Sequence, residues 1–157
     1  MTDTKLLTPR EKAVIALMAE SRSNKQIARA LQISVSTVKS YVSSILLKLA
    51  LKSRLQVGLY ALQQGLVTVD AAFYQRVLGC DSVPEDGVRL TVRQHDIVRL
   101  AAAGLCLKEM AIQLQISLYT VKVHLHHVLL RLQVADRYCA IIMAMRLGLL
   151  EWADMAY

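Results

Sequence analysis

The chain has 157 residues, of which 55% are hydrophobic but only 5% aromatic, and its formal net charge at pH 7 is +7. This length suits one or two small domains, whose cores must be built from aliphatic side chains because rings are scarce. The longest apolar stretch, 138–145, is far shorter than the ~20 residues that span a bilayer, so we expect a cytoplasmic protein without a membrane partner. The positive charge favours a polyanionic partner.

The three cysteines, Cys80, Cys106 and Cys139, form no CxxC pair and no Cys/His pair with metal-ligand spacing. An odd count without such spacing indicates neither a disulfide framework nor a zinc site, so we expect reduced thiols and no cofactor. The sequence also lacks a phosphate-cradling glycine loop, a nucleophile paired with a base, and clustered carboxylates. An enzyme is therefore not expected.

Two helices are predicted near the start of the chain. Residues 8–11, with the sequence TPRE, offer a cap, a proline for the first helical position and the acid of a capping box, so a helix runs from there to about Glu20. Ser23 and Gln26 offer a second capping box. It opens a short helix that continues to about Leu31.

A third predicted helix follows a tight turn at 32–34 and starts near Val35, and a fourth runs from about 55 to 64 and ends at Gly65. The inward face of the third helix carries Val38, Val42, Ile45, Leu46 and Leu49, and its opposite face carries Ser36, Lys39, Ser40 and Ser43. A face with one lysine and several small polar side chains can lie close against a DNA groove. The order of short helix, tight turn and longer helix is that of helix-turn-helix DNA-binding proteins.

The same pattern then recurs along the chain. Adding 83 to each number aligns 7–67 with 90–150 without a gap, and about a third of the positions are identical, which indicates a duplicated unit. Between the copies, 68–78 predicts a short helix ending at Gly79, and 80–88 an acidic turn or loop. We therefore predict an all-α protein of two tandem four-helix helix-turn-helix domains, 1–67 and 90–157, joined by a short, partly helical linker, 68–89.

Charge distinguishes the two copies. Residues 1–67 contain ten cations and three anions, a formal charge of +7, whereas 68–89 carry −2 and 90–157 carry +2. The first copy is therefore the better candidate for binding a polyanion.

The motifs of the first copy also carry a family resemblance. They are Leu7-Thr8-Pro9-Arg10-Glu11, Ser23-Asn24-Lys25-x-Ile27-Ala28, Ile33-Ser34-x-x-Thr37-Val38-Lys39 and Gly65-Leu66. Together they resemble the LuxR-type (LuxR/FixJ/GerE-like) DNA-binding domain. The resemblance implies a bacterial-type transcription regulator that binds specific sequences of double-stranded DNA, with its third helix in the major groove.

The resemblance also implies which residues of the first copy contact DNA. The base edges are reached by Lys39, Ser40 and Ser43. The phosphates are contacted by Asn24, Lys25, Ser36, Thr37 and Tyr41, with Lys52 and Arg54 as further backbone contacts. Phosphate contacts fix the register of such a domain and base contacts specify its site.

The second copy departs from the first at several of these positions. Val92 replaces the helix-starting proline, Gln94 replaces the glutamate, and Cys106-Leu107 replaces the Ser-Asn pair, which predicts a lost cap worth about 1 kcal/mol. The resemblance places Lys122, Val123 and His126 toward bases and Thr120 and His124 toward phosphates, with Lys108 and Arg137 kept from the first copy. We expect weaker or differently specific DNA contact from this copy.

The histidines His124, His126 and His127 suggest either a metal site or a pH-dependent contact with DNA. Only His124 and His127 share a helix face, and no third ligand stands at a fixed spacing. We therefore interpret the three as exposed polar residues at a groove and predict no metal.

The fourth helix of the second copy, 136–145, is apolar almost all round, which predicts a contact outside its own domain. Its interface residues are Tyr138, Ile141, Ile142 and Met145. LuxR-type domains commonly dimerise through this helix, so it pairs either with the fourth helix of the first copy, as an intrachain pseudo-dimer, or with a second chain, as a homodimer. The third interpretation is that these apolar residues only complete the core of their own domain. An alternative function is a protein-interaction module that binds another regulator or RNA polymerase through this repeat.

Overall fold

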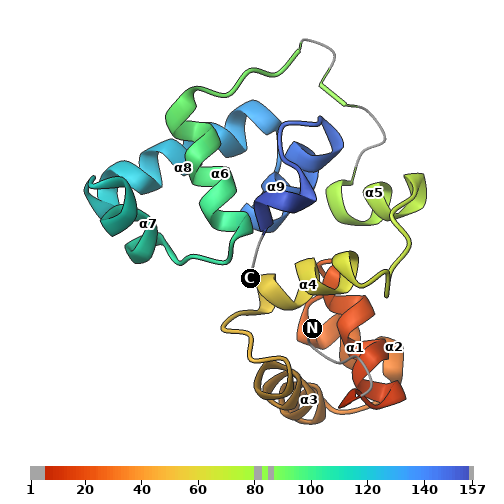
Figure 1. Ribbon diagram of the computed structural model, residues 1–157. Coiled ribbons are helices and arrows are strands. Elements are labelled where there is room, and N and C mark those ends of the chain that lie inside the picture. Colours follow the sequence, from red (N-terminus) through yellow and green to blue (C-terminus); the bar gives the residue numbers. More distant parts are fainter. Residues whose placement is uncertain (1–5, 80–82, 85–86, 156–157) are drawn as a thin grey trace. The chain divides into compact units, whose positions relative to one another are not determined.

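The computed structural model describes residues 6–79, 83–84 and 87–155 of the chain (Figure 1). Within these residues it contains nine α-helices and no strand, which confirms the all-α prediction. None of the helices in the described part of the chain is both long and apolar enough to cross a membrane. The chain divides into two compact units, Met1–Val77 and Leu78–Tyr157, which we call unit 1 and unit 2.

Unit 1 contains the four helices predicted for the first copy. They are α1 (Pro9–Ala19), α2 (Asn24–Leu31), α3 (Val35–Lys48) and α4 (Arg54–Gln63). Helix α1 packs against α4 and α3, and α2 packs against α3. The shared core includes Val38, Ile45 and Leu49 of the third-helix segment, while Val42 and Leu46, also predicted to face inward, are half-buried.

Unit 2 repeats this order of helices. It contains α6 (Val92–Ala102), α7 (Leu107–Leu114), α8 (Leu118–Leu132) and α9 (Arg137–Arg146), followed by a short 3-10 helix at Trp152–Met155. Helix α8 packs against α6, α7 and α9. Each unit is therefore one complete copy of the duplicated pattern.

Local side-chain caps start the first helix of each unit. In unit 1 the Thr8 hydroxyl accepts from Glu11 N at 3.2 Å and Glu11 Oε2 accepts from Thr8 N at 2.8 Å. In unit 2 Thr91 and Gln94 make the same two bonds, at 3.3 and 3.1 Å. The exchange of glutamate for glutamine therefore keeps the capping box, because both side chains end in an oxygen that accepts the backbone N–H.

The fourth helices end as the sequence predicts. Gly65 after α4 and Gly148 after α9 adopt φ of +63° and +68°, a conformation that glycine reaches without steric cost. Helix α4 starts at Arg54, one residue before the predicted position, and is buried at every residue from Gln56 to Leu62. Helix α9 is likewise buried from Cys139 to Ala144.

The predicted connecting helix is α5 (Ala71–Leu78). The Asp70 carboxylate accepts from Phe73 N at 2.7 Å and so caps its start, and Gly79 follows its end with φ of +71°. Arg76 on α5 forms an ion pair with Glu20 at the end of α1, with Nε and Oε1 2.9 Å apart. Cys80 and most of the predicted loop at 80–88 lie outside the described residues.

Candidate nucleic-acid interface

The turn between α2 and α3 is the tight turn of a helix-turn-helix motif. Gln32 takes the left-handed conformation with φ of +54°, and Ile33 N donates to Ala28 O at 3.0 Å. Ser34 then caps α3 by accepting from Thr37 N at 3.0 Å. Unit 2 repeats the turn, with Gln115 at φ +54° and Ser117 capping Thr120 N at 3.0 Å.

The outer face of α3 matches the prediction. Its exposed residues include the predicted contacts Ser36, Thr37, Lys39, Ser40 and Ser43, whereas Tyr41 is half-buried. Neither α2 nor α3 contains an aspartate or glutamate. Small hydroxyl side chains allow the helix backbone to come close to a groove, and no fixed anion on either helix opposes the approach of phosphate.

A hollow of about 480 Å³ lies between the start of α1 and this face of α3. It is lined by Thr8, Arg10, Glu11, Thr37, Ser40, Tyr41 and Ser44. Arg10 is exposed and lines the hollow together with Ser40 and Tyr41. The sequence predicts only a helix start at Arg10, because 24 residues separate it from α3 and no local pattern shows that the two lie close together.

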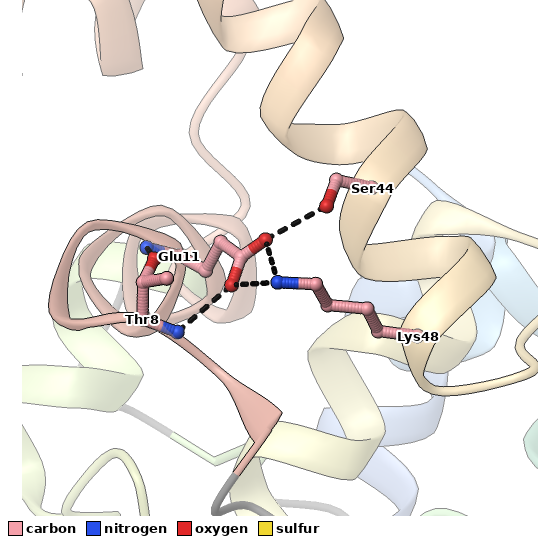
Figure 2. A network of polar contacts seen from close by, with 4 residues as sticks. All are labelled: Thr8, Glu11, Ser44 and Lys48. Atoms are coloured by element: carbon pink, nitrogen blue, oxygen red, sulfur yellow. Dashed lines mark hydrogen bonds and ion pairs between the residues drawn. The ribbon is translucent and has the colours of Figure 1, made fainter.

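An ion pair between a buried carboxylate and a partly exposed lysine joins α3 to α1 beside this hollow (Figure 2). Lys48 Nζ lies 2.9 Å from both carboxylate oxygens of Glu11, and Ser44 Oγ donates to Glu11 Oε1 at 2.8 Å. Burial acts to raise the pKa of Glu11, but the hydrogen bonds from Lys48, Thr8 and Ser44 outweigh it and lower the pKa to about 2. The Glu11 carboxylate is therefore ionised at neutral pH, and the ammonium group of Lys48 balances its charge.

The Arg54 guanidinium, which the sequence predicts to contact the DNA backbone, forms hydrogen bonds within unit 1. Its Nη1 donates to Asn24 Oδ1 at 2.7 Å, and its Nη2 donates to the Arg22 carbonyl oxygen. Both Asn24 and Arg54 are half-buried, and burial lowers the pKa of Arg54. These bonds join the start of α4 to the start of α2, whereas Lys25 and Lys52 are exposed.

Unit 2 keeps part of this arrangement. Arg137 Nη1 donates to the Leu105 carbonyl at 3.2 Å, as Arg54 does to Arg22, but Leu107 stands where Asn24 accepts in unit 1. Cys106 stands at the cap position of α7, and its N–H donates to Glu109 Oε2 at 2.7 Å, which keeps this half of the capping box. A thiol, a weak acceptor, thus takes the place of the serine hydroxyl that caps α2 in unit 1.

The remaining predicted residues of unit 2 lie on α7 and α8. Lys108, Lys122 and His126 are exposed, and Thr120, Val123 and His124 are half-buried. The prediction that all three histidines are exposed is therefore wrong for His124, which lies nearer the core side of α8 than His126 and His127. The rings of His126 and His127 lie 6.2 Å apart. In the part of the chain that the structure describes, no group of three histidine, cysteine or carboxylate side chains is placed to hold a metal ion.

The predicted interface residues lie on α9. Ile141 and Ile142 are buried, and Tyr138 and Met145 are half-buried. Cys139 on the same helix is also buried, and this burial, together with the Asp136 carboxylate, raises the pKa of its thiol to about 12. Its thiol therefore stays protonated at neutral pH and is chemically inert.

The repeated tight turn and the acid-free outer face of α3 are typical of domains of the helix-turn-helix class. The family described as bacterial regulatory proteins of the luxR family matches residues 5–61 and again 88–144. The chain belongs to this family and contains two copies of its domain.

Relatives of the chain include the response regulator protein VraR of Staphylococcus aureus, Staphylococcus epidermidis and Staphylococcus saprophyticus. Each is 44% identical to it over 62 residues, which make up 40% of this chain and 30% of the relative. The chain thus covers less than a third of the length of these proteins. No solved structure gives a significant match to it.

Proposed function

We propose that unit 1 binds specific sequences of double-stranded DNA, with α3 in the major groove, and that the protein thereby regulates transcription. The outer face of α3 carries this proposal: Lys39, Ser40 and Ser43 are exposed side by side on a helix without an acid. Lysine donates to the guanine O6 and N7 acceptors, and serine hydroxyls donate or accept at either kind of base pair. The function is binding and involves no reaction.

Phosphate contacts would hold α3 in register. Ser36 and Thr37 lie in the first turn of α3, where the helix dipole favours an anion. Lys25 lies in the first turn of α2 and Lys52 precedes α4; Arg10, a third exposed cation, lines the hollow. Tyr41 lines the same hollow, and Asn24 and Arg54 support the surface through the bond that joins them.

Unit 2 has fewer of the features that favour DNA binding than unit 1. It keeps the exposed cations Lys108 and Lys122, but Val123 offers no hydrogen bond where unit 1 has Ser40. We expect it to contact DNA less tightly, with Thr120, His124, His126 and Arg137 near the backbone or groove. The bound site should then be asymmetric, because the two units differ.

Assembly through the fourth helices is part of the proposal. The half-buried Tyr138 and Met145 would join α9 either to α4 of the same chain or to a second chain, whereas the predicted partners Ile141 and Ile142 are already buried. RNA polymerase or another regulator is the alternative partner of unit 2. The symmetry of the bound DNA separates these arrangements. A palindrome indicates two chains, and an asymmetric site indicates one.

Selection of bound duplexes from a random DNA library tests the proposal. The intact chain and Lys39→Ala are compared at near-physiological salt, because binding to DNA is meaningful only at a stated salt concentration. We expect an enriched motif with the intact chain and its loss or relaxation with Lys39→Ala. Lys122→Ala, the matched change in unit 2, should alter the motif less. Absence of any enriched motif with the intact chain would refute sequence-specific binding.

A further inference from the structure

The outer face of α8 differs in chemistry from the outer face of α3. Tyr119, Val123, His126 and Leu130 follow one another at intervals of four, three and four residues, so they form one stripe along the helix, which we call the α8 stripe. The core side of α8 is marked by the buried residues Val121, Val128 and Leu132. The stripe therefore points away from the core.

The side chains of the α8 stripe are large and open to solvent. Tyr119 is 76% exposed and Leu130 62%, and His126 is exposed while Val123 is half-buried. Unit 1 has Ser36, Ser40, Ser43 and Leu47 at the aligned positions. Three hydroxyl groups suited to a groove have thus been replaced by two apolar or aromatic side chains and an imidazole.

Helix α7 extends this apolar character. It packs against α8 and exposes 78% of Ile112, where unit 1 carries Arg29. Single exposed apolar residues are ordinary, and Leu130 has an exposed counterpart in Leu47 of unit 1. Tyr119 and Ile112, however, add two further exposed apolar or aromatic side chains on two packed helices, where unit 1 has Ser36 and Arg29, and this indicates a surface that a partner covers.

The charges around the α8 stripe are positive. Helix α8 contains no aspartate or glutamate, Lys122 lies beside Val123, and Arg131 follows Leu130. On α7, Lys108 lies one turn before Ile112, and Glu109, the single acid of that helix, accepts from the Cys106 N–H. An apolar stripe edged by cations is complementary to an apolar face edged by carboxylates.

We propose that the α8 stripe and Ile112 bind an acidic amphipathic helix of a partner protein. Apolar side chains of that helix would cover Tyr119, Leu130 and Ile112, and its flanking carboxylates would lie near Lys122 and Lys108. DNA fits this face less well, since its groove edges are mostly polar and would leave the leucine and isoleucine without an apolar contact. The proposal does not depend on DNA binding by unit 1, and a helix bound here would cover the α8 residues through which unit 2 would otherwise contact DNA.

Selection from a displayed library of helical peptides tests this proposal with the full chain. Apolar, acidic, basic and neutral residues vary independently in the library. We expect enrichment of peptides with leucine, isoleucine or phenylalanine at i, i+3 or i+4, and i+7, flanked by aspartate or glutamate. Enrichment of no pattern, or of basic peptides as readily as acidic ones, would overturn the proposal.

Variants then assign the selected peptide to this face. Tyr119→Ser with Leu130→Ser should raise the Kd of the peptide about tenfold or more, as loss of central anchors does. Leu47→Ser is the matched control, because Leu47 is the aligned leucine of unit 1 and is also exposed, and it should leave the Kd unchanged. An unchanged Kd in the double variant refutes the assignment.

A charge reversal gives a second readout that does not depend on the apolar changes. Lys122→Glu alters one exposed side chain and should weaken binding of the acidic peptide while strengthening binding of its lysine-substituted counterpart. Duplex binding is measured on the same variants. If Tyr119→Ser with Leu130→Ser lowers DNA affinity and leaves peptide binding unchanged, the face belongs to DNA and the proposal fails.

Discussion

Lys48, at the end of α3, places its Nζ 2.9 Å from both carboxylate oxygens of Glu11, in the first turn of α1. Only 4% of the Glu11 side chain is exposed, against 35% of the Lys48 side chain, so the pair closes the edge of the core. Gln94 and Arg131 take these positions in unit 2, and Arg131 donates to the Arg89 carbonyl at 2.5 Å. The two units thus hold their third helices by different polar contacts.

Replacing Glu11 with glutamine should destabilise unit 1 by about 1–3 kcal/mol, because Lys48 and Ser44 lose an ionised acceptor. The partial exposure of Lys48 limits the loss, since its ammonium group can be hydrated. Amide hydrogen exchange of the full chain measures the effect on unit 1, with α6 of unit 2 as an internal reference. Glu20→Gln, which alters the more exposed pair with Arg76, is the control and should cost less. Equal losses in the two variants would contradict the prediction.

The same carboxylate predicts how stability depends on pH. The pKa of Glu11 is about 2 in the fold against an ordinary value of 4.5, so the folded state binds fewer protons at this site than the unfolded state. Its contribution to stability is complete above pH 4.5 and is lost as the pH falls toward 2. The difference in exchange protection between wild type and Glu11→Gln should therefore shrink across this window. A difference that stays constant from neutral pH to pH 3 would show that the pair does not act through ionisation.

Three lysines should affect DNA binding in different ways. Lys39→Ala should weaken binding to the selected site by about 1–3 kcal/mol and relax specificity at one position. Lys25→Ala, at the start of α2, should weaken binding to all sequences alike and lower the salt dependence. Lys122→Ala should cost less than Lys39→Ala. Binding isotherms on the selected site and on an unrelated duplex, at two salt concentrations, distinguish these outcomes, and equal losses for Lys39 and Lys122 would indicate two equivalent DNA-binding units.

The helices of both units could be predicted because their signals are local. Thr8 and Glu11 are three residues apart, as are Ser23 and Gln26, and each pair forms the capping box that its spacing predicts. The exposed face of α3 follows from helical periodicity in the same way, which is why Lys39 and its serine neighbours lie where the sequence places them.

The contacts that join the helices could not be predicted from local patterns. Glu11 and Lys48 are separated by 37 residues, and Asn24 and Arg54 by 30. Nothing in the spacing of such residues shows that they meet. The sequence therefore predicts only a capping role for Glu11 and only a phosphate contact for Arg54. The burial of α9 was visible as an apolar composition, but composition does not tell which surface covers Ile141 and Ile142.

The internal partners of Arg54 predict a loss of stability in addition to any loss of DNA binding. Arg54→Ala should destabilise unit 1 by about 1–3 kcal/mol, because Asn24 Oδ1 and the Arg22 carbonyl lose a charged donor in a half-buried setting. Arg54→Lys should recover only part of this, since an ammonium group cannot reproduce the two-nitrogen geometry. Lys52→Ala, at an exposed position nearby, is the control. Thermal unfolding without DNA checks the prediction, and a variant with an unchanged melting temperature would leave Arg54 with a phosphate role alone.

Replacing the thiol at the start of α7 with a hydroxyl should stabilise unit 2. In unit 1 Ser23 Oγ accepts from Gln26 N at 3.3 Å, whereas the aligned position of α7 carries the thiol of Cys106, which is a weaker acceptor. Cys106→Ser should therefore raise the stability of unit 2 by about 1 kcal/mol, which corresponds to about 4–8 °C in the melting temperature of a domain of this size. Cys106→Ala removes the thiol without supplying an acceptor and should give no gain. Because Cys106 is exposed, neither change disturbs the core, so equal melting temperatures for the serine and alanine variants would show that hydroxyl capping does not limit this helix.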